Sequence, residues 1–337
     1  MTIRDEIPRE MIKPATLDRW PRGIAYHKGF RILGTPLGFG DVIGCLRFLD
    51  HLEAKGPRKG ERIITSQLLS LAFGEKRRRN DILGLGHTQT IRLGQMALRI
   101  YPAGLGPGSA QLEVSIKDRK ILYCGGVRMA RPLICAAAEV PRCDLLLLDA
   151  PISEPKPPAP ATMSKALQAW LRACIDEKQR PFMIFGNRAA ALEAVYSASG
   201  LGRPLRVQRR LFEMIRRMSV DLPLGNAVLR LGKKVKDDEG ALISIADWHK
   251  SRFFEEPDKR VAYIGPGRAV PPFADVAFRM GESEDRPGML AYIKQTGATQ
   301  VALGDMTDES LTEPLQEMGI EAFRLTHPEQ IPLPFRI

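Results

Sequence analysis

The sequence predicts an α/β protein, and three observations support this prediction. Short apolar runs rich in leucine and β-branched residues, bounded by Gly, Pro or charged residues, recur along the first half of the chain. In the second half, further runs of this kind alternate with segments whose apolar residues have helical spacing. Prolines at positions 155, 157, 158 and 160 separate the two patterns. Such a segment continues neither a helix nor a central strand, so we expect a boundary there.

Before this boundary, the chain carries mainly strand signals. They are KGFRILG, ERIITS, MALRIYPA, AQLEVSI, RKILYCGG and CDLLLLDA, at residues 28–34, 61–66, 96–103, 110–116, 119–126 and 143–150. The run LEVSIKDRKILYC predicts a hairpin, because polar KDRK separates its two apolar arms.

After the boundary, helices and strands alternate. Residues 163–178 place apolar side chains at helical spacing behind a Ser/Thr-rich start. A strand at 181–186, a helix at 187–200, a strand at 203–208 and a helix at 209–219 follow, which predicts a small α/β layer of about 95 residues. Strands at 240–247, 259–267, 299–305 and 320–325, with helices at 287–297 and 311–319, complete the chain.

Composition predicts a soluble protein. Of the 337 residues, 44% are hydrophobic and 26% charged, and no apolar run reaches the ~18 residues that span a bilayer. The N-terminal MTIRDEIPREMIKP mixes both charge signs without an apolar stretch, so we expect no secretion signal, no membrane partner and a cytoplasmic location. The cysteines form no C-x-x-C pair, which predicts reduced thiols, mostly buried; they are Cys45, Cys124, Cys135, Cys143 and Cys174.

The net charge of +11 is unevenly distributed. Residues 180–236 contain twelve Lys or Arg and three acids, a net charge of +9, whereas residues 281–337 contain four basic and ten acidic residues, a net charge of −6. A basic region suits a polyanion such as nucleic acid, although a solvated basic face gives the same pattern. The candidate phosphate-binding residues are Arg77, Arg78, Arg79, Arg206, Arg209, Arg210, Arg216, Arg217, Lys233 and Lys234.

Four blocks of sequence, in order, resemble one family. They are YPAGLGPGSAQLEV, RKILYCGG, VPRCDLLLLDAPISEP and the C-terminal stretch from GESEDRPGML to EAFRL. Their motifs and spacing are similar to those of the ligase-associated DNA exonuclease group of metallo-β-lactamase-fold nucleases, relatives of the β-CASP nucleases. The resemblance covers about residues 25 to 326. It implies an αββα sandwich formed by residues 1–159 and 256–337, with a β-CASP-like α/β insert at 160–255.

The same resemblance implies that the metal site of the family is lost. Nucleases of this fold hold two metal ions with clustered His and Asp ligands. The five histidines at 27, 51, 87, 249 and 327 include no two within four residues of each other, so H-x-H-x-D-H does not occur. Asp50, His51 and Asp149 keep a polar side chain at family positions. The other family positions are Leu46, Phe48, Leu105, Gly126, Ser283 and Asp305, so we expect no catalytic residues and no bound metal.

Three hypotheses about function stay open. The first is a catalytically inactive nuclease paralogue, a pseudoenzyme that binds single-stranded or tailed DNA, RNA, or a DNA-repair or processing partner. The second is a divergent exonuclease with a rebuilt site for one Mg²⁺ or Mn²⁺. The ligands would come from Asp50, His51, Asp149 or Asp305, or from an acidic set formed by Asp305, Glu282, Glu284 and Asp285. The third is a structural subunit that regulates an active paralogue.

Two other motifs are interpreted as loops. The Gly-rich GTPLGFGDVIG lacks the G-x-x-x-x-G-K-S/T order of a phosphate-binding loop, and GPGRAVPPF is typical of a turn. Asp50 and His51 are interpreted as residual hydrogen-bonded structural groups, with a remnant of a different site as the alternative.

Overall fold

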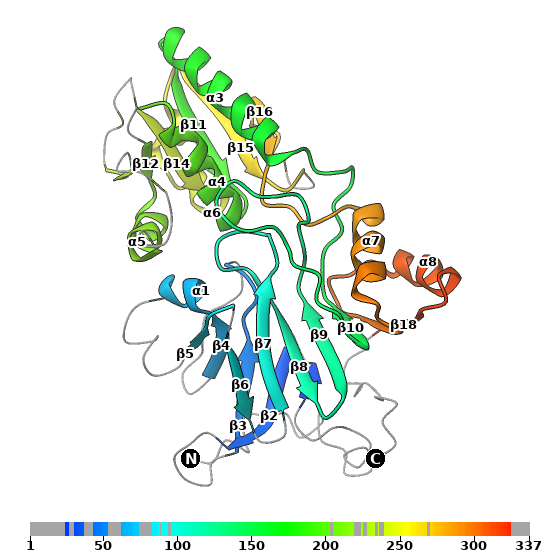
Figure 1. Cartoon of the computed structure of the whole chain (residues 1–337). Coiled ribbons are helices and arrows are strands. Elements are labelled where there is room, and N and C mark those ends of the chain that lie inside the picture. The colour runs from blue at the N-terminus through cyan, green and yellow to red at the C-terminus, as the bar shows by residue number, and fades with distance from the viewer. Residues whose placement is uncertain are drawn as a thin grey trace.

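The computed structural model describes residues 24–26, 30–36, 43–52, 62–73, 82–87, 89–93, 96–202, 205–218, 224, 228–232, 235, 239–267 and 270–324. Strands and helices in these ranges form three sheets (Figure 1). The mixed α/β class that the sequence predicts is therefore confirmed.

The first sheet has five strands. Its order is β1 (Ile24–Tyr26), β2 (Phe30–Pro36), β3 (Ile43–Phe48), β4 (Arg62–Ser66) and β5 (Ile82–Leu85). The pairs β1–β2 and β2–β3 are antiparallel, and the pairs β3–β4 and β4–β5 are parallel. The short helix α1 (Gln67–Leu71) follows β4, and the Ser66 side chain caps it by accepting from the Leu69 N–H.

The second sheet has seven strands and lies beside the first. Its order is β18 (Glu321–Arg324), β17 (Gln300–Leu303), β10 (Leu145–Leu148), β9 (Arg119–Cys124), β8 (Ala110–Ile116), β7 (Met96–Pro102) and β6 (Thr90–Leu93). The predicted hairpin is confirmed, because Ile116 pairs with Arg119 across the Lys117–Asp118 turn, where Lys117 has a φ of 52°. The half from β9 to β18 is parallel.

Apolar side chains hold the two sheets together. Phe48 and Ile64 of the first sheet pack with Leu112 and Leu147 of the second in one buried cluster. The opposite face of the second sheet buries Leu146 and its neighbours against α7 (Arg286–Thr296), η6 (Glu309–Leu311) and α8 (Thr312–Glu317). This part, called the core below, thus has two packed sheets with helices outside the second. Burying each large apolar side chain contributes about 1.5–3 kcal/mol.

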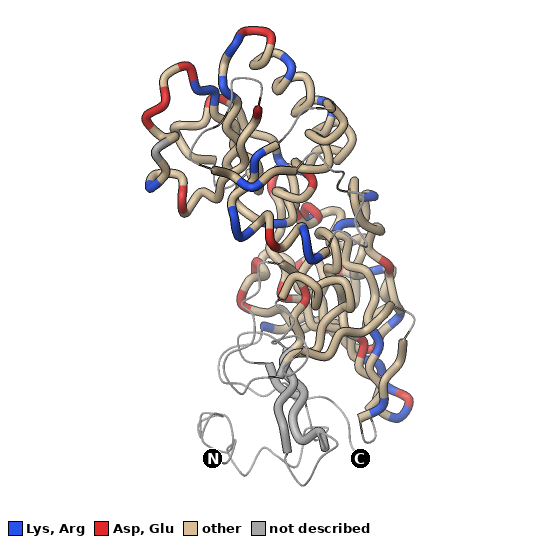
Figure 2. Tube along the Cα trace, turned by 90° about the vertical axis from the view of Figure 1, so that its left-hand side faces the viewer, with Lys and Arg blue, Asp and Glu red and all other residues tan. Residues whose placement is uncertain are grey.

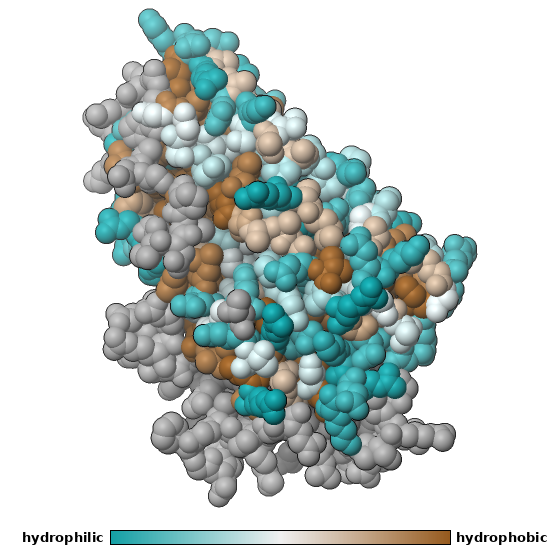
Figure 3. Space-filling view, in the orientation of Figure 1, coloured by the Kyte–Doolittle hydropathy of each residue, from teal (hydrophilic) through white to brown (hydrophobic). Residues whose placement is uncertain are grey.

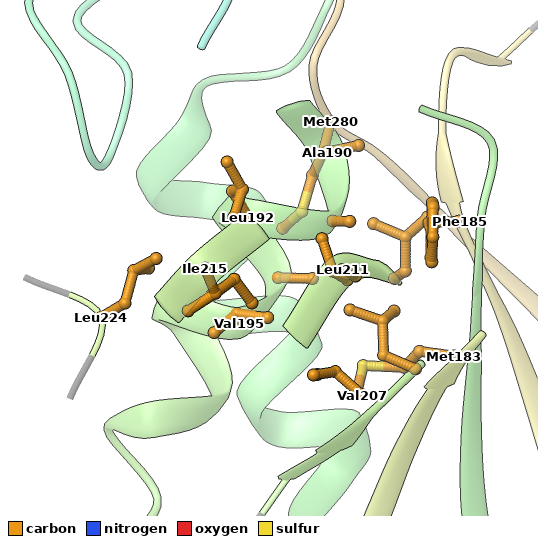
Figure 4. Packing of buried hydrophobic residues seen from close by; sticks show 14 of the residues in the cluster. Met183, Phe185, Ala190, Leu192, Val195, Val207, Leu211, Ile215, Leu224 and Met280 are labelled. Carbon is orange, nitrogen blue, oxygen red and sulfur yellow. The ribbon is translucent and has the colours of Figure 1, made fainter. Parts of the chain in front are cut away.

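The third sheet has six strands, all parallel. Its order is β13 (Val228–Arg230), β12 (Leu205–Val207), β14 (Gly240–Ser244), β11 (Arg180–Phe185), β15 (Lys259–Gly265) and β16 (Val276–Arg279). One face packs on α3 (Pro160–Asp176), α4 (Arg188–Ser199) and α5 (Arg209–Met218), with the close packing shown in Figure 4. The other face packs on α6 (Ile245–Trp248) and η4 (Arg252–Glu255). The third sheet with these helices is called the insert below.

The insert extends further along the chain than the sequence predicts. Its expected end was residue 255, but β15 pairs in parallel with β11, with Arg180 opposite Lys259 and Phe185 opposite Ile264. The adjacent β16 pairs with β15. The insert therefore continues to Arg279. A short apolar run predicts a strand but carries no information about which sheet the strand joins, so the boundary was placed too early.

The core and the insert share one apolar cluster. Leu52 and Leu69 of the core belong to the same buried cluster as Leu211 and Ile215 of α5. Arg217 on α5 also donates to the Ala72 carbonyl at the end of α1, at 3.0 Å. In the space-filling view, the described hydrophobic residues on the visible face form separate patches among hydrophilic ones (Figure 3). Burial of Leu52, Leu69, Leu211 and Ile215 in the shared cluster holds the insert against the core.

Within the described residues, every helix is too short or too polar to cross a bilayer. Cys124, Cys135, Cys143 and Cys174 are free thiols, as predicted, while the side chain of Cys45 lies outside the described set. Burial raises the pKa of Cys124, Cys135 and Cys143 to about 12 and that of Cys174 to about 11. These thiols stay protonated at neutral pH, so they are poor nucleophiles.

Candidate functional site

The loop between β7 and β8 is shaped by glycines and one serine. The Ser109 hydroxyl accepts from the N–H groups of Leu105 and Gly106, at 2.9 and 3.2 Å, and donates to the Gly106 carbonyl at 2.8 Å. Gly104 has a φ of 75°, and a Cβ there would lie 2.3 Å from the Arg128 carbonyl oxygen. Only glycine fits this position. The loop thereby holds Leu105 at the end of the second sheet.

Leu105, Gly126 and Ser283 lie together. A Cβ on Gly126 would lie 2.8 Å from the Leu105 Cδ1 and 3.4 Å from the Ser283 Oγ, and Gly126 has a φ of 143°. The Ser283 hydroxyl accepts from the Val127 N–H at 3.2 Å and donates to the Val127 carbonyl at 3.0 Å. The serine therefore closes a structural bridge between β9 and the segment before α7, and the leucine methyl group fills the space above Gly126.

Asp50 and His51 lie at the end of β3, against the same turn. The Asp50 Oδ1 is 2.7 Å from the His51 Nδ1, and a Cβ on Gly125 would lie only 1.6 Å from the Asp50 Oδ2. The Asp50 carbonyl accepts from the Ala110 N–H at 2.8 Å. Burial raises the pKa of the Asp50 carboxyl, but His51 and the backbone N–H groups of both residues outweigh burial, so this pKa lies below its usual value.

We expect Asp50→Asn to lower the free energy of unfolding at pH 7 by about 1–3 kcal/mol, because it removes the charge from a buried hydrogen bond. Asp50 has a lowered pKa in the folded state, so its contribution is fully present above the unfolded pKa of about 3.9 and is lost as the pH falls through the folded pKa. Urea denaturation at neutral and acid pH measures the difference between the proteins. A difference that stayed constant down to the lowest pH at which both fold would contradict this account.

Asp149 and Asp305 lie at the ends of β10 and β17. The Asp149 carboxylate accepts from the Met306 N–H at 2.9 Å, and its own N–H donates to the Cys124 carbonyl at 2.8 Å. Asp305, the residue before Met306, is exposed. The carboxylate of Asp149 thus orders the turn that carries Asp305.

Four of the nine positions named from the resemblance, Asp50, Leu105, Gly126 and Ser283, lie around one turn. Gly125 and Gly126, the turn after β9, contact Asp50, Leu105 and Ser283. Phe48 is 3% exposed and packs edge-on against Tyr123 with ring centroids 5.8 Å apart, so it is a core residue. Leu46 lies in β3, and its side chain is outside the described set. Over the described residues, no three His, Cys, Asp or Glu side chains are placed to hold a metal ion.

Three carboxylates near α7, those of Glu282, Glu284 and Asp285, form contacts within the protein. Glu282 forms an ion pair with Arg279 at 2.6 Å, and the Glu284 carboxylate accepts from the Met129 N–H at 2.6 Å. Asp285 caps α7 by accepting from the Gly288 N–H at 3.0 Å. Each of these three carboxylates has a structural role in the contact between β9, the insert and α7.

The predicted phosphate-binding residues fall into three groups. Arg206 forms a bidentate ion pair with the buried Glu239, so its charge is paired within the insert. Arg209, Arg210, Arg216 and Arg217 are exposed on α5, where Glu213 pairs with Arg209 at 2.8 Å and with Arg217 at 3.8 Å. The remaining residues, Arg77, Arg78, Arg79, Lys233 and Lys234, lie outside the described residues.

A buried ion pair that no sequence motif predicts links this region to the insert. Arg128 follows the turn after β9, and its Nη1 lies 3.2 and 3.3 Å from the two carboxylate oxygens of Glu193 on α4. The two side chains are 3% and 2% exposed. Nearby, Arg188 at the start of α4 donates to the Leu52 carbonyl at 2.7 Å. Helix α4 is thus fixed directly beside the converging family positions.

Comparisons with known proteins bear on the fold alone. No known protein family matches the chain, and no curated protein is similar to it in sequence. Among solved structures, the chain is similar to a protein of unknown function from Enterococcus faecalis V583, with a TM-score of 0.56 and 14% sequence identity. The similarity covers 85% of this chain and 80% of that protein. Most of the α/β arrangement is therefore shared with that protein.

Proposed function

We propose that this chain is a catalytically inactive member of the metallo-β-lactamase-fold nucleases and that it binds nucleic acid through its insert. One observation carries the proposal. The resemblance places Leu105, Gly126 and Ser283 at metal-ligand positions, and a Cβ on Gly126 would lie 2.8 Å from the Leu105 Cδ1 and 3.4 Å from the Ser283 Oγ, although the three residues are far apart in the sequence. An inherited metal pocket requires such proximity, and these side chains are the wrong ones for holding a metal.

The layers of the core support the finer fold assignment. Two sheets pack face to face, helices α7 and α8 cover the outer face of the second sheet, and an α/β insert interrupts the core between β10 and α7. Two packed sheets with helices outside the second are three of the four layers of an αββα sandwich, and the insert lies where the resemblance places a β-CASP-like domain.

The chemistry of the pocket supports the loss of activity. Leu105 and Gly126 offer no lone pair, and the Ser283 hydroxyl is engaged with the Val127 backbone. A divalent cation needs several donors to replace its hydration shell, so an apolar pocket disfavours it strongly. Asp50 and His51 bond to each other in place of a shared ion.

The charge on α5 supports nucleic-acid binding. Arg210 and Arg216 are exposed on this helix, and Figure 2, which views the side on which α5 lies, shows basic segments around an acidic one where the insert meets the core. Phosphate contacts by such arginines release counterions and give salt-dependent affinity without sequence preference.

Metal analysis and a cleavage assay test the loss of activity. We expect the purified protein to contain far less than one Mn or Zn per chain by elemental analysis and to cleave neither single-stranded nor tailed DNA with Mg²⁺ or Mn²⁺ added. Cleavage that depends on one added ion would favour the rebuilt site, which Asp50, His51, Asp149 and Asp305 would form. Co-purification with an active nuclease would favour the regulatory subunit.

A pair of double variants tests the binding surface. We expect Arg210→Ala with Arg216→Ala to weaken binding of labelled single-stranded DNA about ten-fold at ~50 mM salt and to reduce the slope of log affinity against log salt by about 2. Lys165→Ala with Arg172→Ala removes the same charge from exposed positions on α3 and serves as the control. Fluorescence anisotropy measures both. Equal losses in the two double variants would show that α5 is not the binding surface.

A further inference from the structure

A group of aromatic rings lies on the face of the insert that α3, α4 and α5 leave uncovered. The imidazole of His249 lies 5.0 Å from the ring of Phe254 and 5.0 Å from that of Phe273, and the two phenylalanine rings are 6.3 Å apart. Trp248 lies beneath them, 6.0 Å from Phe254 and 6.4 Å from Phe273. Four rings from α6, η4 and the loop before β16 therefore form one cluster.

The cluster is buried below and open above. Trp248 is fully buried, whereas Phe254 is 37% exposed. His249 is exposed and Phe273 is half-buried. Trp248 anchors the group in the apolar face of the third sheet, together with Phe182 and Phe253. The outer rings keep part of their surface in water even though they contact several other rings.

Basic side chains border this cluster. Lys250 follows His249 and is exposed. Arg210 at the start of α5 is close enough to Asp247 on α6 that its charge lowers the pKa of that carboxyl, after the larger effects of hydrogen bonds from Ser244 and Gln208. The start of α5 thus adjoins the helix that carries Trp248.

Two further residues of the insert pack on the same face. Leu231 and Val235 pack in the apolar cluster that contains Trp248. The described cations near the partly exposed rings are Lys250, which follows His249, and Arg210, which lies near Asp247 on α6. Cations close to exposed rings suit a chain that carries both phosphates and π-faces.

We infer that His249, Phe254 and Phe273 form a stacking platform for the unpaired bases of a single-stranded nucleic acid, with Lys250 and Arg210 as the nearest described cations. The inference rests on the proposed function and adds the side chains that contact the bases. Bases in a duplex have both faces occupied by their neighbours, so they cannot stack on protein rings without unpairing. The platform therefore selects single strands over duplexes and has no sequence preference.

Paired affinities test this inference. The probes are a labelled oligothymidylate of about 20 nucleotides and a duplex of the same length, measured by fluorescence anisotropy at ~50 mM salt. We expect Phe254→Ala with His249→Ala to weaken binding of the oligothymidylate about ten-fold and binding of the duplex less than about two-fold. Phe254→Tyr should keep the affinity for the single strand, because it keeps the ring.

The controls separate this inference from the proposed function. Leu229→Ala truncates another exposed apolar residue of the insert, 39% exposed, and should leave both affinities unchanged. Thermal unfolding of each variant shows that the fold is retained. Wild-type protein that binds neither probe would overturn the proposed function and this inference with it. Wild-type protein that binds both, with the same affinities as Phe254→Ala with His249→Ala, would overturn the platform alone.

Discussion

Replacing Glu193 by glutamine is expected to lower the free energy of unfolding by about 3–5 kcal/mol. The variant leaves the Arg128 guanidinium buried at 3% exposure without the carboxylate that lies 3.2 Å from it. A buried guanidinium without a carboxylate partner loses its hydration, and no ion pair offsets this loss. Urea denaturation followed by tryptophan fluorescence measures the loss.

Two controls identify the cause as an unpaired charge. Arg128→Met with Glu193→Leu removes both charges and fills the same space, so we expect a stability close to that of the wild type. Glu213→Gln breaks an exposed ion pair with Arg209 on α5 and should have a much smaller effect than Glu193→Gln. If the Arg128→Met and Glu193→Leu double variant were as unstable as Glu193→Gln, loss of shape complementarity would be the cause.

The ion pair shows where sequence reasoning reaches its limit. Helix α4 and the strand before Arg128 were both predicted from local patterns, and both are present. The contact between Arg128 and Glu193 joins residues 65 positions apart, and no periodicity or spacing encodes it. The same limit applies to the end of the insert. The apolar run of β15 predicts a strand, but its pairing with β11 depends on the packing of the whole sheet.

The candidate site was predictable in part for a different reason. Motif order places Leu105, Gly126 and Ser283 at related positions, and in the structure Leu105 and Ser283 both lie close to Gly126. Their present roles were not predictable. Ser283 bridges the Val127 backbone through its hydroxyl, and Asp50 lies against Gly125. Such roles depend on distances of a few ångströms between segments that meet only after folding.

The aromatic cluster shows a further limit. Trp248 is fully buried beneath the other rings. The spacing of His249, Phe254 and Phe273 in the chain follows no motif, so the sequence does not predict that their rings meet. Two of them come from short turns around α6 and η4, and Phe273 comes from the loop before β16. Only the pairing of β15 with β16 brings that loop to the same face.

The second large effect is expected at Gln111, the glutamine of the GSAQ block. Its amide donates to the carbonyls of Pro102 and Glu139, both at 2.8 Å, and its side-chain oxygen accepts from the Tyr292 hydroxyl. Gln111 and Tyr292 are both fully buried. Burial, with Cys124 and Cys143 nearby, raises the pKa of Tyr292 well above its usual value, so the hydroxyl keeps its proton and remains a donor.

Gln111→Leu should therefore lower the free energy of unfolding by about 2–4 kcal/mol, because it removes three buried hydrogen bonds and leaves the Tyr292 hydroxyl without its acceptor. Tyr292→Phe should cost about 1–2 kcal/mol, since it removes one of them. The two changes act on the same bond, so the double variant should lose less than the sum of the single losses. Gln316→Leu, at an exposed position on α8, is the matched control for the change of side chain. If the losses in free energy of unfolding were additive in urea denaturation, Gln111 and Tyr292 would stabilise the fold independently. The hydrogen bonds between them would then not explain why a glutamine lies beside the loop that holds Leu105.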